Sequence, residues 1–243
     1  MSPEQPPILK VSRLVKRFGG FHALDGLSFH VMAGEILGLV GPNGSGKTTA
    51  INVISGLYAP DGGEVVFDGV ASGGVASHKL VHRGINRTFQ VPKPFLSLTV
   101  RENIQVALAY GRATVAPPSM AELLDEYRLK EVADLPAADL NSAQQKMLDL
   151  TRALATRPRL LLLDELAAGL NPAELDWIAG RIKALAATGT AVIVVEHLMG
   201  FIEQITDRVI VLNAGKEIFE GTLATAVREP KVIEVFLGGE HAA

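Results

Sequence analysis

The feature that most constrains this chain is a phosphate-loop pattern, G-x-x-x-x-G-K-T, at residues 41–48. Directly before it, residues 36–40 form an apolar run typical of a buried strand. Glycines let such a loop turn its backbone N–H groups toward a phosphate, the lysine adds positive charge at the β- and γ-phosphates, and the threonine hydroxyl can hold Mg²⁺. A glycine-rich turn that matches by chance would not explain the strand in front. We predict a nucleotide site formed by Gly41, Pro42, Asn43, Gly44, Ser45, Gly46, Lys47, Thr48 and Thr49, with a helix behind it whose positive end faces the same anion.

Composition limits the classes to which the chain can belong. With 243 residues, of which 48% are apolar, it can form one large domain or a domain with an insert. A net charge of −3 argues against nucleic acid as the main partner. The absence of cysteine excludes disulfides and thiolate metal sites and fits a cytosolic setting. Residues 1–7 lack the features of a signal peptide and are expected to form a loose leader, and the apolar runs are far shorter than the about 18 residues of a membrane span.

The spacing of apolar residues predicts an α/β fold. Short alternating or β-branched segments, with Gly and Asp between them, indicate antiparallel strands near the N-terminus. These segments are residues 8–18, 26–31 and 64–67. Farther along, strand and helix patterns alternate, which implies a parallel sheet with right-handed crossovers. The strands are expected at residues 160–163, 190–195 and 208–212, and the helices at 48–56, 172–188, 198–205 and 229–237.

Residues 91–155 differ in character from the segments on either side. They open with Pro92 and Pro94 and continue with stretches rich in Ala, Leu and Glu at 100–110 and 120–132, which we interpret as helices. This segment is therefore a helical insert between two parts of the sheet. We expect residues 1–243 to form a single domain with a P-loop NTPase parallel sheet, an N-terminal antiparallel β subdomain and this inserted helical subdomain.

Two carboxylates follow the apolar run at residues 160–163. A buried strand would place Asp164 and Glu165 at the C-terminal edge of the sheet, where open α/β sheets bind ligands. Asp164 is suited to hold Mg²⁺ through water, and Glu165 to activate an attacking water. Solvated acids at a strand end are the plainer alternative, but the phosphate loop favours the catalytic interpretation. His197 ends the next strand in the same way and is a candidate γ-phosphate contact, although a lone histidine is usually a surface or structural residue.

Two weaker signals come from Gln90 and Phe18. Gln90 precedes the proline-rich start of the insert, and its neutral amide can reach both Mg²⁺ and water, whereas the plain alternative is a polar loop residue. Phe18 can stack on adenine, although a single aromatic is more often part of a core. The candidates are therefore Glu165, His197 and Gln90 for catalysis, and Thr48, Gln90 and Asp164 for the metal.

In this order, these motifs resemble those of the nucleotide-binding subunit of ATP-binding-cassette (ABC) transporters, from Phe18 to the C-terminal helix. The resemblance implies that Phe18 stacks on adenine, that residues 41–48 are the Walker A loop and that Gln90 is the Q-loop residue. It implies ATP and Mg²⁺ as ligands.

The same resemblance assigns roles to the second half of the chain. It makes Asp164 and Glu165 the Walker B pair, His197 the switch histidine and residues 168–171 the D-loop. It also implies a dimer, in which each ATP lies between the Walker A loop of one subunit and the signature motif of the other.

The chain departs from the family pattern at that signature, L-S-G-G-Q at the start of a helix. Asn141 replaces the serine and can still donate a hydrogen bond, and Ser142 replaces a glycine that relatives often vary. Ala143 adds a Cβ where backbone must approach phosphate closely. By resemblance, the contacts to the nucleotide of the opposite subunit are Asn141, Ser142, Ala143 and Gln144. Leu166 also stands where a proline is usual.

Residues 84–90, 167–172 and 232–238 are similar to those of ATPases from high-affinity branched-chain amino-acid importers. Such systems imply integral membrane permease subunits, a second ATP-binding subunit that is identical or different, and a periplasmic solute-binding protein as an indirect partner. They place the ATPase peripherally on the cytoplasmic face of the inner membrane. Related importers carry urea, amides or aromatic acids, and similar subunits export lipids or polysaccharides, so the solute stays open.

Two alternatives lie outside transport. Soluble cassette ATPases that act on ribosomes carry two cassettes, and those that act on DNA carry long coiled coils, whereas this chain has one phosphate loop and no heptad run. A small P-loop kinase would leave His197 and the signature positions unexplained.

Overall fold

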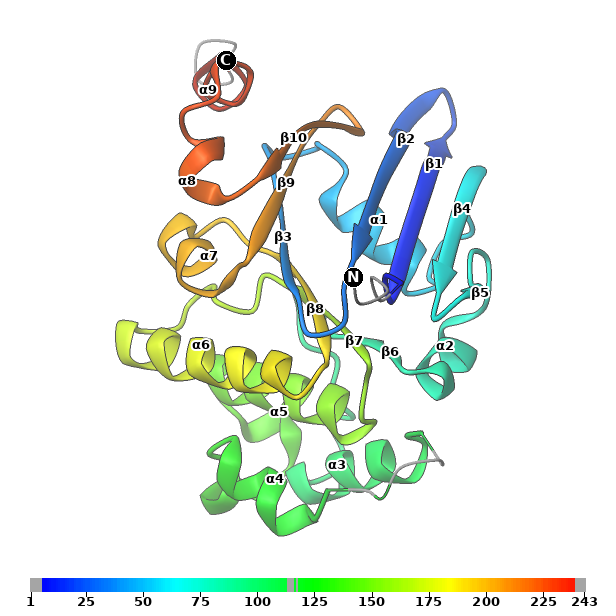
Figure 1. Cartoon of the computed structure of the whole chain (residues 1–243). Coiled ribbons are helices and arrows are strands. Elements are labelled where there is room, and N and C mark those ends of the chain that lie inside the picture. The colour runs from blue at the N-terminus through cyan, green and yellow to red at the C-terminus, as the bar shows by residue number, and fades with distance from the viewer. Residues whose placement is uncertain (1–5, 113–115, 117, 239–243) are drawn as a thin grey trace, which may run out of the picture.

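The computed structural model describes residues 6–112, 116 and 118–238 (Figure 1), so most of the expected leader lies outside the described residues. Two β-sheets flank helix α1 (Lys47–Ile54), and further helices cover the opposite face of the larger sheet (Figure 1). The α/β class, the antiparallel N-terminal sheet and the predominantly parallel second sheet are all confirmed.

The smaller sheet has the strand order β2-β1-β4-β5. Its strands are β1 (Leu9–Phe18), β2 (Phe21–Val31), β4 (Gly62–Phe67) and β5 (Val70–Ala71). All pairs are antiparallel. Short turns join β1 to β2 and β4 to β5, whereas β4 returns to pair with β1 after the chain has passed through β3 and α1. Strand β2 begins five residues before the predicted start at Gly26, which has a φ of 87° inside the strand. The register between β1 and β2 shifts at several points, and this irregularity hides the alternating pattern.

The larger sheet has the order β10-β9-β3-β8-β7-β6, and β10 alone is antiparallel to its neighbour. Its central strands are buried along their whole length, as expected for a parallel sheet covered on both faces. In β7, Leu160 and Leu162 face α1 and the smaller sheet, whereas Leu161 and Leu163 face the helical layer. The strands are β3 (Ile36–Val40), β6 (Ile85–Arg87), β7 (Leu160–Asp164), β8 (Ala191–Val195), β9 (Arg208–Asn213) and β10 (Lys216–Gly221).

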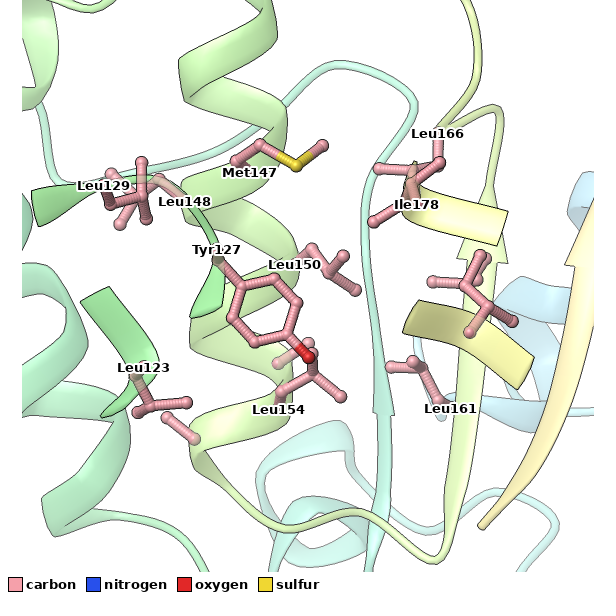
Figure 2. Close-up of a cluster of buried hydrophobic side chains, with 14 of the residues drawn as sticks. Leu123, Tyr127, Leu129, Met147, Leu148, Leu150, Leu154, Leu161, Leu166 and Ile178 are labelled. Atoms are coloured by element: carbon pink, nitrogen blue, oxygen red, sulfur yellow. The ribbon is translucent and has the colours of Figure 1, made fainter. Parts of the chain in front are cut away.

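The segment 91–155 is helical and shares its core with the larger sheet. It contains α3 (Val100–Ala109), α4 (Met120–Glu126), two short 3₁₀ turns (Lys130–Val132 and Ala137–Asp139) and α5 (Ser142–Ala155). Helix α5 packs between this segment and the sheet: Figure 2 shows Met147, Leu150 and Leu154 between Tyr127 on one side and Leu161 on the other.

The predicted helix over residues 120–132 is wrong in its second half. Helix α4 ends at Glu126, and Arg128 adopts a left-handed conformation with φ of 57°. The N–H groups of Arg128 and Leu129 turn back to the carbonyls of Asp125 and Leu124, which is the Schellman ending that usually carries glycine. The guanidinium of Arg128 lies over the ring of Trp177, 4.4 Å from its centroid, and this packing stabilises an ending that the sequence does not signal.

The remaining helices complete the layers. Helices α6 and α7 agree with prediction to within about a residue, and α9 continues to Gly238. The elements that the sequence does not predict are too short or too polar to show a pattern: α2, α8, β5, β6 and β10. These helices are α2 (Ser77–Arg83), α6 (Pro172–Ala187), α7 (Met199–Ile205), α8 (Leu223–Ala226) and α9 (Pro230–Gly238). Among the described residues, no helix is both long and apolar enough to cross a membrane.

Candidate nucleotide-binding site

A cavity of about 370 Å³ opens at the C-terminal ends of the parallel strands. It brings together side chains from the β1–β2 turn, the phosphate loop, the start of α1 and the ends of three strands. Its lining is Phe18, Phe21, Ala23, Asn43, Gly44, Ser45, Gly46, Lys47, Thr48, Thr49, Gln90, Glu165 and His197. Most of the residues predicted from sequence therefore share one cavity, and Phe21 and Ala23 are additions that sequence reasoning missed.

The phosphate loop has a shape that only glycine permits at two positions. Gly41 has a φ of 148°, and a Cβ on it would lie 2.2 Å from the carbonyl oxygen of Leu212. Gly46 has a φ of 109° and would meet the carbonyl of Ala23 at 2.6 Å. Helix α1 starts directly afterwards, so its free N–H groups and positive dipole end face the cavity. The buried hydroxyl of Ser45 has no hydrogen-bond partner in the described part of the chain.

The ammonium of Lys47 lies across this loop. Its Nζ donates to the carbonyl oxygens of Gly41 at 2.7 Å and Pro42 at 2.9 Å. Burial lowers the pKa of Lys47, and the negative charges of Glu165 and Asp164 oppose that shift. The lysine that the sequence predicts at the phosphates therefore lies at the loop, where the charges of two acids act on it.

Glu165 is held from both sides. Its Oε2 accepts a hydrogen bond from Gln90 Nε2 at 2.7 Å, and its Oε1 lies 3.0 Å from His197 Nε2. The backbone of Glu165 is left-handed, with φ of 50°, and its N–H donates to the carbonyl of Val195. A non-glycine residue in this region is strained and persists only where its surroundings fix it. All three predicted catalytic residues thus meet at one carboxylate.

Asp164 lies deeper, outside the cavity lining. It is 2% exposed, and its Oδ2 forms an ion pair of 3.1 Å with Arg87 Nη2. Its other oxygen, Oδ1, is buried without a partner among the described residues. Burial raises the pKa of Asp164, and the charge of Arg87 opposes that shift. Arg87 also donates to Asn52 and Ser55. Sequence reasoning missed Arg87 because it lies in β6, a strand of only three residues.

Phe18 stands at the outer rim. It is 44% exposed, its ring meets the edge of Tyr58 with centroids 5.3 Å apart, and the ammonium of Lys16 lies 5.5 Å from the ring centroid. Phe21, even more exposed, stands near it on the other strand of the hairpin. A ring that leaves one face open is available for stacking on a flat ligand.

The predicted signature residues lie elsewhere. Asn141 caps helix α5, accepting from the N–H of Gln144 at 2.9 Å, while the side chain of Gln144 accepts from the N–H of Asn141 at 3.0 Å. With Ala143 they line a separate pocket of about 190 Å³ beside Trp177. Within one chain these residues take no part in the phosphate-loop cavity. Asn141 thus uses its side-chain oxygen as a helix cap, which leaves its amide hydrogens for other partners.

Within the described residues, no group of three or more His, Asp or Glu side chains forms a cage for a metal. A metal at this cavity would need oxygen atoms from a ligand as well as from the protein, which is how Mg²⁺ is usually held beside phosphates.

Comparison with known proteins places this geometry in context. A family model described as "ABC transporter" matches residues 24–168. The chain is 37% identical to the high-affinity branched-chain amino acid transport ATP-binding protein BraF of Pseudomonas aeruginosa, covering 96% of this chain and 98% of that protein. The fold matches the crystal structure of the ADP conformation of an ATP-binding cassette of an ABC transporter, with a TM-score of 0.84, 32% identity and coverage of 96% and 100% of the two chains. It also matches a dimeric, post-hydrolysis cassette bound to ADP and Pi, with a TM-score of 0.80, 26% identity and coverage of 88% and 98%.

Proposed function

Because the chain belongs to the ABC transporter family as an ATP-binding subunit, we propose that it hydrolyses ATP to drive import of branched-chain amino acids or related solutes. The observation that carries the proposal is the position of Glu165 at the phosphate-loop cavity, with Gln90 and His197 on its two oxygens. A carboxylate so placed can take a proton from a water that attacks a phosphate bound in the loop.

The binding roles follow from the cavity lining. The adenine stacks on Phe18, and the phosphates lie in the loop of residues 41–49, of which residues 43–49 line the cavity, against the first N–H groups of α1. Lys47 exchanges its two carbonyl partners for phosphate oxygens. The hydroxyl of Ser45, buried without a described partner, is free to turn toward the same group.

Thr48, Gln90 and Asp164 are the proposed residues for Mg²⁺. The fit is supported by the unpartnered Oδ1 of Asp164, because a buried carboxylate oxygen without a donor is suited to accept from metal-bound water. Bound Mg²⁺ would neutralise charge on the phosphate oxygens. Arg87 holds the other oxygen of Asp164 and so fixes the direction in which Oδ1 points.

Hydrolysis depends on Glu165 and its two neighbours. The carboxylate orients a water and accepts its proton, and His197 contacts the γ-phosphate and holds Glu165 at Oε1. Gln90, which is part of the loop before the helical insert, sets the position of Oε2. Movement of that loop would therefore alter the geometry of Glu165 directly.

The family also implies partners, and the chain offers surfaces for them. A second ATP-binding subunit would complete each ATP site, with Asn141, Ser142, Ala143 and Gln144 serving the nucleotide of the partner. The loop after Gln90 exposes Val91, Phe95 and Leu96, a small apolar surface of the kind that meets another protein.

We propose that this surface contacts a membrane permease, at the cytoplasmic face of the inner membrane, with a periplasmic solute-binding protein acting through that permease. In this scheme residues 1–243 are one nucleotide-binding domain, and residues 91–155 are its helical subdomain.

The solute is proposed from the relatives alone. BraF is named for branched-chain amino acids. An ATPase that serves urea, amides, aromatic acids or an exported lipid would use the same nucleotide cavity, so the cavity does not distinguish these solutes.

We propose testing the solute by reconstituting the chain with its permeases, partner ATPase and solute-binding protein and measuring ATP hydrolysis. Leucine should stimulate hydrolysis, whereas urea and phenylalanine should not, and the opposite ranking would reassign the solute. Absence of hydrolysis in the whole complex would overturn the ATPase itself.

A further inference from the structure

Lys146 is a buried lysine in the second turn of α5. It is 7% exposed, and its Nζ donates to the carbonyl oxygens of Glu165 at 3.0 Å and Leu166 at 3.2 Å, and also to that of Ala168. One ammonium therefore satisfies three backbone acceptors in the four-residue segment 165–168, which we call the acid loop. Burying a lysine is costly unless its donors are fully used, and here they are.

The acid loop needs such a restraint. Glu165 has a φ of 50°, a strained conformation for a residue other than glycine, which persists only where the surroundings hold it. At the next position Leu166 replaces the proline expected from the family resemblance, so no pyrrolidine ring fixes its φ. The carbonyl groups of both residues point to Lys146.

A buried acid also holds the same loop. Glu196 is 2% exposed, and its Oε1 accepts from the N–H of Ala167 at 2.6 Å. Burial raises the pKa of Glu196 and lowers that of Lys146, and the charge of each opposes the shift of the other. The loop is thus held by a lysine that binds its carbonyls and by an acid that binds an N–H, and Glu196 directly precedes His197.

The packing around Lys146 keeps its helix in place. Figure 2 shows its neighbour Met147 extending from α5 on the side where Leu166 and Ile178 lie, and all three belong to one buried cluster. Farther along α5, at intervals of three residues, Asp149 accepts from the N–H of Phe89 at 2.9 Å and Arg152 donates to the carbonyl of Lys93 at 2.8 Å. Helix α5 therefore holds both the loop that contains Gln90 and the acid loop that contains Glu165.

We propose that Lys146 is a positioning residue that fixes the backbone of Glu165, and through it the direction of the carboxylate toward the bound phosphate. This inference rests on the proposed ATPase function. Lys146 does not line the phosphate-loop cavity, so its loss should reduce turnover and leave nucleotide binding intact. A lysine that only stabilised the fold would instead lower the melting temperature and the nucleotide affinity together.

The experiment uses the assembled transporter with four variants of this chain. Lys146→Met keeps the length of the side chain and removes its donors, Lys146→Arg keeps donors and charge, and Lys183→Met is a matched control on the exposed face of α6. Glu165→Gln measures the effect of removing the proposed catalytic base. The measurements are kcat and KM for ATP hydrolysis, MgADP affinity by calorimetry and the melting temperature.

We expect Lys146→Met to lower kcat by about tenfold or more, because displacing a catalytic group by a fraction of an ångström is costly. KM and MgADP affinity should change by less than about twofold. Lys146→Arg should recover most of the rate, and Lys183→Met should match the wild type. Combining Lys146→Met with Glu165→Gln should add little to the loss caused by Glu165→Gln alone, because both act through one carboxylate.

Three results would overturn the inference: wild-type turnover in Lys146→Met, a parallel loss of kcat and MgADP affinity, or a fully additive double variant. If Lys146→Met does not fold, as judged by the absence of a melting transition, Lys146→Gln replaces it and is judged by the same three criteria. Failure of that variant to fold also counts against the proposal. The proposed function fails separately, through a wild-type complex that does not hydrolyse ATP or whose rate Glu165→Gln leaves unchanged.

Discussion

Gln90 donates a hydrogen bond of 2.7 Å to the carboxylate of Glu165, 75 positions later in the chain. The first residue belongs to the loop that leads into the helical segment, and the second to the loop after β7. With His197 on the other oxygen, the carboxylate is held by one side chain from each of two further strand ends. The position of Glu165 is therefore sensitive to movements of the Gln90 loop.

Glu165→Gln should lower ATP turnover by about 10²-fold or more, because the amide keeps the shape of the side chain and loses the base. The variant should also accumulate as an ATP-bound dimer. Steady-state hydrolysis in the assembled transporter and size-exclusion chromatography with MgATP test the two effects. Glu203→Gln, on the exposed part of α7, is the matched control. Unchanged turnover in Glu165→Gln would remove this residue from the chemistry.

Lys47→Ala should weaken MgATP binding by about 1.5–3 kcal/mol, the usual contribution of a hydrogen bond to a charged group. The loss of the phosphate contact is offset in part, because the variant does not have to break the bonds that Lys47 forms with the loop carbonyls of Gly41 and Pro42. Calorimetric titration with MgATP measures it, with Lys79→Ala on the exposed surface of α2 as control. An affinity equal to that of the wild type would refute the role of Lys47 at the phosphates.

Phe18 should tolerate other aromatic residues. Phe18→Tyr and Phe18→Trp should preserve ATP affinity, whereas Phe18→Ala should weaken it by about 1–3 kcal/mol, the range found for base stacking on aromatic side chains. Phe21→Ala, at the neighbouring ring in the same cavity, tests whether stacking is specific to one position. If all Phe18 variants bind ATP equally, the ring serves only to pack against Tyr58.

The loop around residues 91–98 should contact the permease. Its apolar side chains Val91, Phe95 and Leu96 are exposed. The ring of Phe95 also contacts Arg152 on α5, whose guanidinium lies 5.0 Å from the ring centroid. Cysteine introduced at Lys93 or Ser97 should cross-link to a cytoplasmic permease loop, and the chain has no native thiol to compete. A transporter that stays active but forms no cross-link with linkers of several lengths would argue against this surface.

The two ATP sites of a heterodimer should differ in rate. Ala143 places a methyl group in the first turn of α5, where the family pattern has glycine, and we expect this methyl group to obstruct approach to the γ-phosphate of the partner only. Asn141→Ser with Ala143→Gly should therefore speed the site that contains the Walker A loop of the partner. Hydrolysis is measured in complexes in which one Walker glutamate at a time is replaced. Equal residual rates from the two halves of the original complex would show that both sites are active.

The sequence predicts the framework well because its signals are local. The fully apolar runs of β3, β7 and β8 are long enough to indicate buried strands, and each lies next to a motif residue. Most candidate residues therefore arrive at one cavity, as expected from the rule that parallel strands end at one edge.

The remaining features depend on contacts between distant segments. The left-handed Arg128 that ends α4 depends on Trp177, 49 positions away by residue number. The partner of Asp164 lies in a strand of three residues, too short to show a period. Lys146 is a charged residue in a helix, and the sequence alone does not distinguish it from the exposed lysines of other helices. In each of these cases, the residues next to the one concerned carry no pattern that would predict the contact.

The ammonium of Lys47 is hydrogen-bonded to two carbonyls of its own loop, and these carbonyls compete with a ligand for the lysine. A ligand binds only if its interactions with the site are more favourable than the two hydrogen bonds that it replaces. A polyphosphate that also reaches the N–H groups at the start of α1 meets that condition through many contacts at once, whereas a single inorganic phosphate has few to offer. We therefore expect small anions to bind weakly at this loop, because its lysine already has two hydrogen-bond partners.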